Sequence, residues 1–353
     1  MKFQKKINGD TAHELLVQKL KPELAFSESA DFSEWKSNLG EKLRELLGLD
    51  KIEKNAAPLK VDIEWEEARD GYTITRFTFE SEPGAVVPCY LLLPDTDKEK
   101  YPVAICLQGH TTGFHLSIGE GKHENDERFL PNNEFAIQAV SHGFAALAIE
   151  QRGMGERRSP RSYGVDNTPY PRPHMCAVQS LDAIMLGRTI IGERVFDVMC
   201  AIDLLEKFPK CDTGRIVITG NSGGGTASFY SACCDGRIGI AAPSCSFCSY
   251  SGSILNIEHC SCNYIPNAAN FFEMQDLSAL IAPRRLIVVT GREDDIFPID
   301  EVRASYATVE KIFAKAGVPD SCRLVETPNA HYWRPDLVWS AICGEAEKLG
   351  WFN

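Results

Sequence analysis

The sequence predicts an α/β fold in which a mostly parallel central sheet carries helices on both faces. Continuous apolar runs, such as residues 103–107, are typical of strands that are buried on both sides. Longer segments with helical periodicity, such as residues 191–205, separate these runs. Strands that alternate with helices in this way form parallel sheets. A glycine-rich turn at residues 220–224 directly follows one of the strands.

The first 55 residues predict a helical extension ahead of the main domain. In residues 31–47 large apolar side chains recur every three or four positions, with Asp31 or Ser33 as the N-cap and Gly48 as the stop. A shorter helix is expected around residues 15–20. We therefore divide the chain into an extension, residues 1–55, and a main domain, residues 56–353. The extension is expected to brace the main domain; the alternative is an oligomer contact.

The main domain begins with three strands and then alternates. Strands are expected at residues 61–65, 72–79, 86–93, 103–107, 145–149, 216–219, 238–242, 286–290 and 323–326. Helices are expected at residues 135–140, 191–205, 301–316 and 337–349. Two segments break the alternation: residues 155–175 are rich in Pro and Arg, and residues 244–270 in Cys, Ser and Asn. Because both follow a strand at the edge where parallel sheets bind ligands, we expect them to shape the substrate pocket.

Composition excludes several classes of partner. The 353 residues are 44% hydrophobic and carry a net charge of −12, which argues against binding to nucleic acid or to an anionic membrane surface. The first ten residues lack the apolar core of a signal peptide, and no apolar run is long enough for a membrane span. Thirteen cysteines scattered among strands and helices suit a reducing compartment, so a cytoplasmic location is expected.

The turn Gly220-Asn221-Ser222-Gly223-Gly224 has the pattern of a nucleophile elbow. A serine on so tight a bend needs neighbours without bulk two positions before it and two after it, because the strand and the helix nearly touch there. The bend lifts the serine hydroxyl out of the sheet and places it beside a helix N-terminus. Ser222 is therefore the candidate catalytic nucleophile.

Serine needs a base to remove its proton, and the base needs an acid to orient it. His331 follows the last expected strand and is the candidate base, because the only other downstream histidine, His259, belongs to the irregular Cys-rich segment. Asp294 follows the strand at residues 286–290 and is the favoured acid. Asp295 and Glu293 are the alternatives, and all three could instead cap the next helix.

An oxyanion hole is expected from two main-chain N–H groups. One belongs to Gly223, directly after the nucleophile, and the other to His110, in the Gly-rich loop after the strand at residues 103–107. The His110 side chain either lines the pocket or packs within its loop.

The Cys-rich segment raises the question of a metal. Cys245, Cys248, His259, Cys260 and Cys262 include the residue types that zinc prefers. Their spacing is loose, and free cysteine is also a common small core residue. We therefore expect neither a metal site nor a cofactor.

The chain resembles the α/β-hydrolase branch that holds acetylxylan esterases and is related to dienelactone hydrolases. The similarity covers roughly residues 85–335. It departs from these esterases at His110, where they carry an aromatic residue, and at Met154, where many carry Gln. Dienelactone hydrolases use Cys where this chain has Ser222. The stretches that carry the resemblance are residues 108–110, 151–156, 186–197 and 281–286, with Phe297 and Pro298.

The resemblance implies an α/β-hydrolase fold and hydrolysis of carboxylic esters through an acyl-enzyme. Carbohydrate deacetylation of the acetylxylan type or short-chain carboxylesterase activity is expected, with a small-molecule or oligosaccharide ester as substrate. The relatives often assemble, so a homo-oligomer is possible. Two other classes are kept: a serine peptidase of the prolyl-oligopeptidase type, whose usual propeller does not fit into about 55 helical residues, and an inactive binding protein on the same fold.

Overall fold

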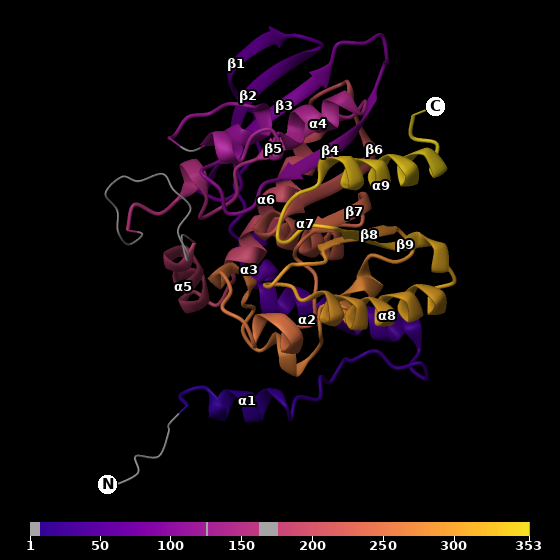
Figure 1. The fold of residues 1–353 in the computed structure, drawn as a ribbon. Helices are drawn as coiled ribbons and strands as arrows, with labels where there is room; N and C mark the ends of the chain where they lie inside the picture. Colours follow the sequence, from indigo (N-terminus) through magenta and orange to yellow (C-terminus); the bar gives the residue numbers. More distant parts are fainter. Residues whose placement is uncertain (1–7, 125, 162–175, 353) are drawn as a thin grey trace.

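The central feature of the computed structural model is a nine-stranded sheet with the order β1-β2-β3-β5-β4-β6-β7-β8-β9 (Figure 1). The structure describes residues 8–124, 126–161 and 176–352. In the view of Figure 1 the sheet descends from β1 at the top to β9. The strands are β1 (Asp62–Arg69), β2 (Tyr72–Glu80), β3 (Val86–Pro94), β4 (Tyr101–Leu107), β5 (Ala145–Ile149), β6 (Cys211–Asn221), β7 (Ile238–Ser244), β8 (Arg285–Gly291) and β9 (Cys322–Thr327).

The sheet is antiparallel at one end and parallel over the rest. β1, β2, β3 and β5 pair antiparallel, and every pairing from β5 through β4 to β9 is parallel. All residues of β4 and β5 are buried, as their apolar sequences require of strands covered on both faces. The carboxyl ends of β4, β6, β8 and β9 therefore meet at one edge, where their following loops converge.

Helices cover both faces of this sheet. On one face α4 (Phe135–Ser141) and α9 (Pro335–Lys348) share an apolar cluster with alternate residues of the central strands, among them Ala104 and Val217. On the other face α6 (Ile190–Leu205), α7 (Gly223–Cys234) and α8 (Ile299–Lys315) pack into a larger cluster with the intervening residues, such as Val103 and Ile218. The arrangement confirms the predicted α/β-hydrolase architecture.

The N-terminal segment adds a further helical layer outside α6. α2 (Phe32–Leu47) begins at the predicted cap, where the Asp31 carboxylate accepts a hydrogen bond from Glu34 N (2.8 Å), and ends at Gly48 in the left-handed conformation (φ 74°). Its buried side chains belong to the same apolar cluster as the sheet. α3 (Leu49–Glu53) follows directly. α1 (Thr11–Val17) begins earlier than expected, buries no residue and lies at the lower edge of Figure 1.

Other elements differ from the sequence-based expectation mainly in length. The elbow strand β6 is longer than its apolar centre, because polar residues at its start still pair with β4. α5 (Ala177–Met185) was not expected. Several of its apolar residues are exposed, so its sequence does not separate an apolar face from a polar face. Most of the segment at residues 155–175 lies outside the described residues. Within the described ranges, no helix is long and apolar enough to cross a membrane.

Candidate active site

Ser222 occupies a strained bend between β6 and α7. Its backbone has φ 54° and ψ −122°, outside the regions that non-glycine residues ordinarily adopt. The Ser222 N–H donates to Ser244 O (2.8 Å) and so ties the bend to the neighbouring strand β7. A Cβ added to Gly220 would lie 2.1 Å from Leu107 O, and one added to Gly224 would lie 1.9 Å from the same atom. Both glycines are therefore required by the close approach of β4.

The imidazole of His331 and the carboxylate of Asp294 form a hydrogen-bonded pair. His331 Nδ1 donates to Asp294 Oδ2 over 2.8 Å. Main-chain hydrogen bonds hold the two loops together, since Arg292 N donates to Thr327 O (2.9 Å) and Glu293 N to Asn329 O (3.2 Å). The histidine loop and the acid loop are thus fixed relative to each other at the ends of β8 and β9.

Asp294 is held as a buried carboxylate. Its other oxygen accepts from the main-chain N–H groups of Ile296 (2.9 Å) and Phe297 (3.0 Å). Burial raises the pKa of this carboxyl, but the hydrogen bond from His331 and the two N–H groups outweigh it and leave the pKa below its ordinary value. Glu293 and Asp295 are exposed. Of the three candidate acids, the structure therefore brings only Asp294 to the imidazole.

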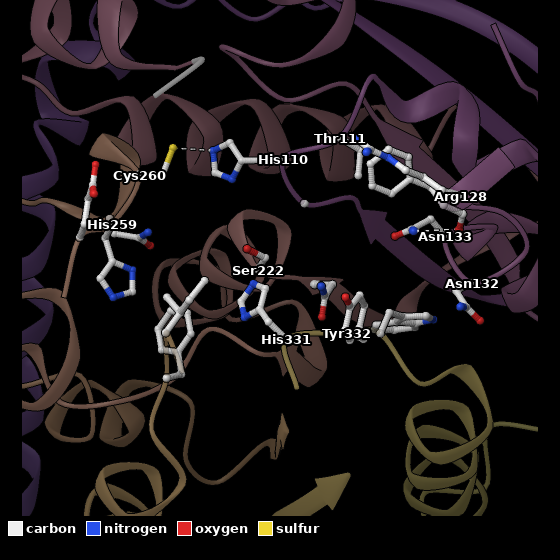
Figure 2. A pocket seen from close by; sticks show the side chains of 18 residues that line it. His110, Thr111, Arg128, Asn132, Asn133, Ser222, His259, Cys260, His331 and Tyr332 are labelled. Carbon is white, nitrogen blue, oxygen red and sulfur yellow. Dashed lines mark hydrogen bonds between the residues drawn. The ribbon is translucent and has the colours of Figure 1, made fainter. Parts of the chain in front are cut away.

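Ser222 and His331 line the same cavity, which has a volume of about 820 Å³ (Figure 2). In Figure 2 the two side chains lie next to each other on its wall. The His331 ring stacks on Phe297, with centroids 5.9 Å apart and planes at 12°. His259, the other downstream histidine that the sequence analysis considered as the base, also lines the cavity. Its Nε2 atom, however, lies 2.9 Å from Ser253 Oγ.

The loop after β4 lies against the elbow at the position expected for an oxyanion hole. A Cβ on Gly109 would lie 2.8 Å from Asn221 O and 3.3 Å from the Ser222 Cβ, so only glycine allows this approach. Thr111 N donates to Gly109 O (2.9 Å), which closes a tight turn around His110. The N–H of Gly223 opens α7 and, as a first-turn group, has no acceptor within its own helix.

The His110 ring lies between the elbow and the Cys-rich segment. A Cβ on Gly223 would lie 2.7 Å from His110 Cε1, and the other side of the ring faces Cys260, with 3.0 Å between Nε2 and Sγ. Of the two alternatives left by the sequence, the first holds, because His110 lines the cavity and its ring contacts cysteines outside its own loop.

The remaining wall of the cavity combines amides and aromatic rings with one arginine. Residues 258–263 contribute part of it, as expected for the irregular segment after β7. Arg128, Asn132 and Asn133 line the opposite side in Figure 2 and were not identified from the sequence, because they lie in a loop without a recognisable motif. The full lining is Gly109, His110, Thr111, Arg128, Phe129, Asn132, Asn133, Asn221, Ser222, Glu258, His259, Cys260, Asn263, Ile296, Phe297, His331, Tyr332 and Trp333.

Comparisons with known proteins place the chain among the abhydrolases. The "Putative hydrolase YtaP" of Bacillus subtilis (strain 168) is 23% identical over 278 residues, which are 78% of this chain and 88% of YtaP. A crystal structure from Bacteroides fragilis, described as a "putative acetyl xylan esterase", superposes with a TM-score of 0.81 at 18% identity, covering 98% of this chain and 97% of that one. A glucuronoyl esterase from Solibacter usitatus gives a TM-score of 0.65 at 16% identity, covering 95% and 100%.

At these identities the two structures establish the fold alone. A family model provides the stronger evidence, since it matches residues 4–232 and therefore includes both the N-terminal helices and the elbow. The chain belongs to the abhydrolase family.

Proposed function

We propose that this protein is a serine esterase in which Ser222 is the nucleophile, His331 the general base and Asp294 the orienting acid. The observation that carries the proposal is the convergence of the three groups: a serine on a strained elbow shares one cavity with an imidazole that is hydrogen-bonded to a buried carboxylate. Serine hydrolases are recognised by this geometry and by these roles.

Each residue has one task in the proposed reaction. His331 Nε2 takes the proton of Ser222 while Oγ attacks the ester carbonyl carbon. The N–H groups of Gly223 and His110 stabilise the oxyanion, and the positive end of α7 adds to this stabilisation. The imidazolium then protonates the departing alcohol, which leaves an acyl group on Ser222. Water, deprotonated by His331, attacks that acyl group, and the imidazolium returns the proton to Ser222 Oγ as the carboxylic acid leaves.

For the substrate we propose a carbohydrate ester, of the acetylxylan type or with a similarly short acyl group. Two structures that share the fold are described as a "putative acetyl xylan esterase" and a glucuronoyl esterase. The cavity volume suits a ligand larger than a simple short ester. Amide side chains such as Asn132 and Asn133 can hydrogen-bond hydroxyl groups, and the ring of Tyr332 offers an apolar face.

A substrate panel tests the proposal directly. The purified chain is assayed with 4-nitrophenyl acetate, acetylated xylo-oligosaccharide, a methyl glucuronate ester and a peptide anilide, each beside the Ser222→Ala variant. We expect turnover of the acetyl esters, no turnover of the anilide, and loss of activity in the variant. Preferential anilide cleavage would indicate a peptidase, and activity retained without Ser222 would refute the nucleophile.

A further inference from the structure

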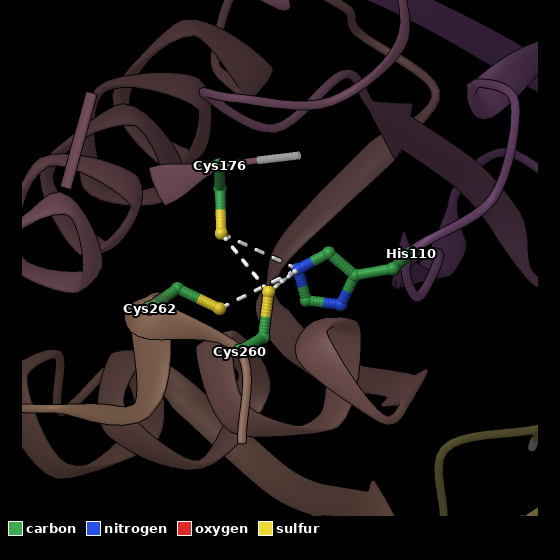
Figure 3. A group of neighbouring side chains, drawn as sticks. All are labelled: His110, Cys176, Cys260 and Cys262. Atoms are coloured by element: carbon green, nitrogen blue, oxygen red, sulfur yellow. Dashed lines mark hydrogen bonds between the residues drawn. The ribbon is translucent and has the colours of Figure 1, made fainter. Parts of the chain in front are cut away.

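Three cysteines from two separate segments converge on the imidazole of His110 (Figure 3). The His110 Nε2 atom lies 3.0 Å from Cys260 Sγ and 3.5 Å from both Cys176 Sγ and Cys262 Sγ. Cys176 Sγ and Cys260 Sγ are 3.2 Å apart. All four potential ligand atoms lie within 4.8 Å of one another. We propose that these residues form a structural zinc site beside the active site.

The spacing of these atoms suits a tetrahedral zinc ion. Zinc binds thiolate sulfur at about 2.3 Å and imidazole nitrogen at about 2.0–2.1 Å, so its ligand atoms stand roughly 3.5–3.8 Å apart. Four of the six separations between these atoms are 3.0–3.5 Å and all six are within 4.8 Å, so zinc binding requires shifts of roughly half an ångström to one ångström. Three thiolates and one imidazole are a donor set that prefers zinc over hard cations such as magnesium or calcium.

Isolated buried cysteines do not produce such an arrangement. The other ten cysteines of the described chain lie outside this cluster, and four of them, Cys89, Cys106, Cys200 and Cys211, are single buried residues in strands or helices. Here Cys176 precedes α5, whereas Cys260 and Cys262 flank Ser261 at the start of the short helix η5 (Ser261–Asn263). The sulfurs from these two elements point at the same nitrogen of a ring from a third segment. The sequence-based expectation of no metal considered a different set, because Cys176 is distant in the chain and His110 was assigned to the oxyanion loop.

A buried cation balances the charge of the proposed site. Three thiolates with one Zn²⁺ carry a net charge of −1, which is costly to bury without a counter-charge. Arg194 on α6 is 1% exposed and interacts electrostatically with all three cysteines. Its Nε and Nη2 atoms donate to Arg152 O, at 3.0 and 2.7 Å, and this fixes the guanidinium in place. Groups of this kind orient metal ligands and tune their charge.

With four protein ligands the site has no open position, so the zinc is structural and takes no part in the chemical steps. Its effect is to tie the loop that follows β4 to α5 and η5. Because His110 also provides the proposed second oxyanion N–H, zinc would hold that N–H in place beside Ser222. Only this last consequence rests on the proposed esterase function; the metal site itself does not.

Metal analysis of the full chain tests the site. The protein is purified under reducing conditions without chelator, and its metal content is measured by inductively coupled plasma mass spectrometry. We expect one equivalent of zinc, released when a mercurial reagent blocks the thiols. Replacement by Co²⁺ should give the thiolate charge-transfer band and the strong visible bands of tetrahedral cobalt. The variants Cys176→Ser and Cys262→Ser should lose the zinc and weaken the cobalt spectrum, whereas Cys343→Ser, outside the cluster, should retain both.

The outcomes separate the metal site from the catalytic assignment. Ser222→Ala should retain zinc while losing esterase activity, and a wild-type chain with zinc but without ester turnover would refute only the proposed function. If a ligand variant fails to fold, metal release and cobalt exchange on the wild-type protein still decide the question. Absence of zinc after reconstitution, stoichiometric iron, or thiol titration showing a Cys176–Cys260 disulfide would each overturn the proposal.

Discussion

His331 Nδ1 donates a hydrogen bond to Asp294 Oδ2 over 2.8 Å, and this contact fixes which imidazole nitrogen faces the cavity. With Nδ1 committed to the carboxylate, the other nitrogen, Nε2, is left free to accept the proton of Ser222. The proposed base is therefore oriented before any substrate enters.

Removal of either partner in the proton transfer should abolish most of the esterase activity. We expect Ser222→Ala and His331→Ala each to lower kcat by about 10³–10⁶-fold, because the nucleophile and the base take part in the same proton transfer and neither is effective without the other. The double variant should be no worse than either single variant. Steady-state kinetics with an acetyl ester measure the effect, and a double variant with a multiplicative loss would contradict a shared step.

The acid can be identified by a matched pair of substitutions. Asp294→Asn should lower kcat by roughly 10⁴-fold, because the amide lacks the charge that stabilises the imidazolium and can impose the wrong tautomer. Asp295→Asn, at the exposed neighbouring position, should leave kcat nearly unchanged. Equal losses in the two variants would remove the basis for choosing Asp294.

The elbow glycines should not tolerate a methyl group. The Cβ of Gly224→Ala would lie 1.9 Å from Leu107 O, so β4 and α7 must separate or the chain must unfold. We expect a loss of more than about 3 kcal/mol in the free energy of unfolding, measured by urea denaturation. Gly344→Ala is the control, because nothing lies within 4 Å of its added Cβ and alanine favours the helical state of α9. Equal stability of the two variants would show that the elbow is less tightly packed than the structure indicates.

A buried carboxyl group should make stability depend on pH. Burial raises the pKa of Glu150 to about 7, although the N–H groups of Phe114 and Glu156 oppose the shift. In the unfolded chain this carboxyl ionises near its ordinary value of 4.5. The folded state therefore holds the extra proton between these two values, and stability falls as the pH rises from 4.5 to 7. The cumulative cost at higher pH is about 3 kcal/mol.

The variant Glu150→Gln isolates this effect. The amide cannot ionise, so its stability relative to wild type should be about 2.5 kcal/mol more favourable at pH 8 than at pH 5. A flip of the Gln108 amide would turn its unpaired Oε1 toward the new NH₂ group, so that a hydrogen bond donated by the NH₂ group replaces the one from Gln108 Nε2 to Glu150 Oε1. Urea denaturation at both pH values measures the difference. The exposed Glu99→Gln serves as control, and a pH-independent difference for Glu150→Gln would show that the carboxyl ionises normally.

The sequence predicted the elements whose local signals are strong. Apolar runs located β4 and β5, helical periodicity located α2 and α6, and the Gly-x-Ser-x-Gly pattern located the bend at Ser222. These features depend on neighbours within a few residues, and sequence displays them directly. Asp294 and His331 were predicted from their order after particular strands, and the structure places their side chains 2.8 Å apart.

Features that depend on contacts between distant segments were not accessible in the same way. Arg152 and Arg157 follow β5 in the sequence, and their side chains are only 10% and 8% exposed because both pair with Asp197 from α6. Their partner lies 40 or more positions away. Likewise, nothing in the spacing of Cys176 and Cys260, 84 positions apart, indicates that their sulfurs meet.

The packing of α2 has a practical consequence for anyone who shortens this protein. Trp35, Leu39, Leu43 and Leu47 project into the same apolar cluster as the sheet and its helices. Each such side chain contributes about 1.5–3 kcal/mol when it is removed from water. A chain shortened to begin at residue 56 would lose that contribution and expose an apolar surface along α6. We expect such a chain to aggregate during expression.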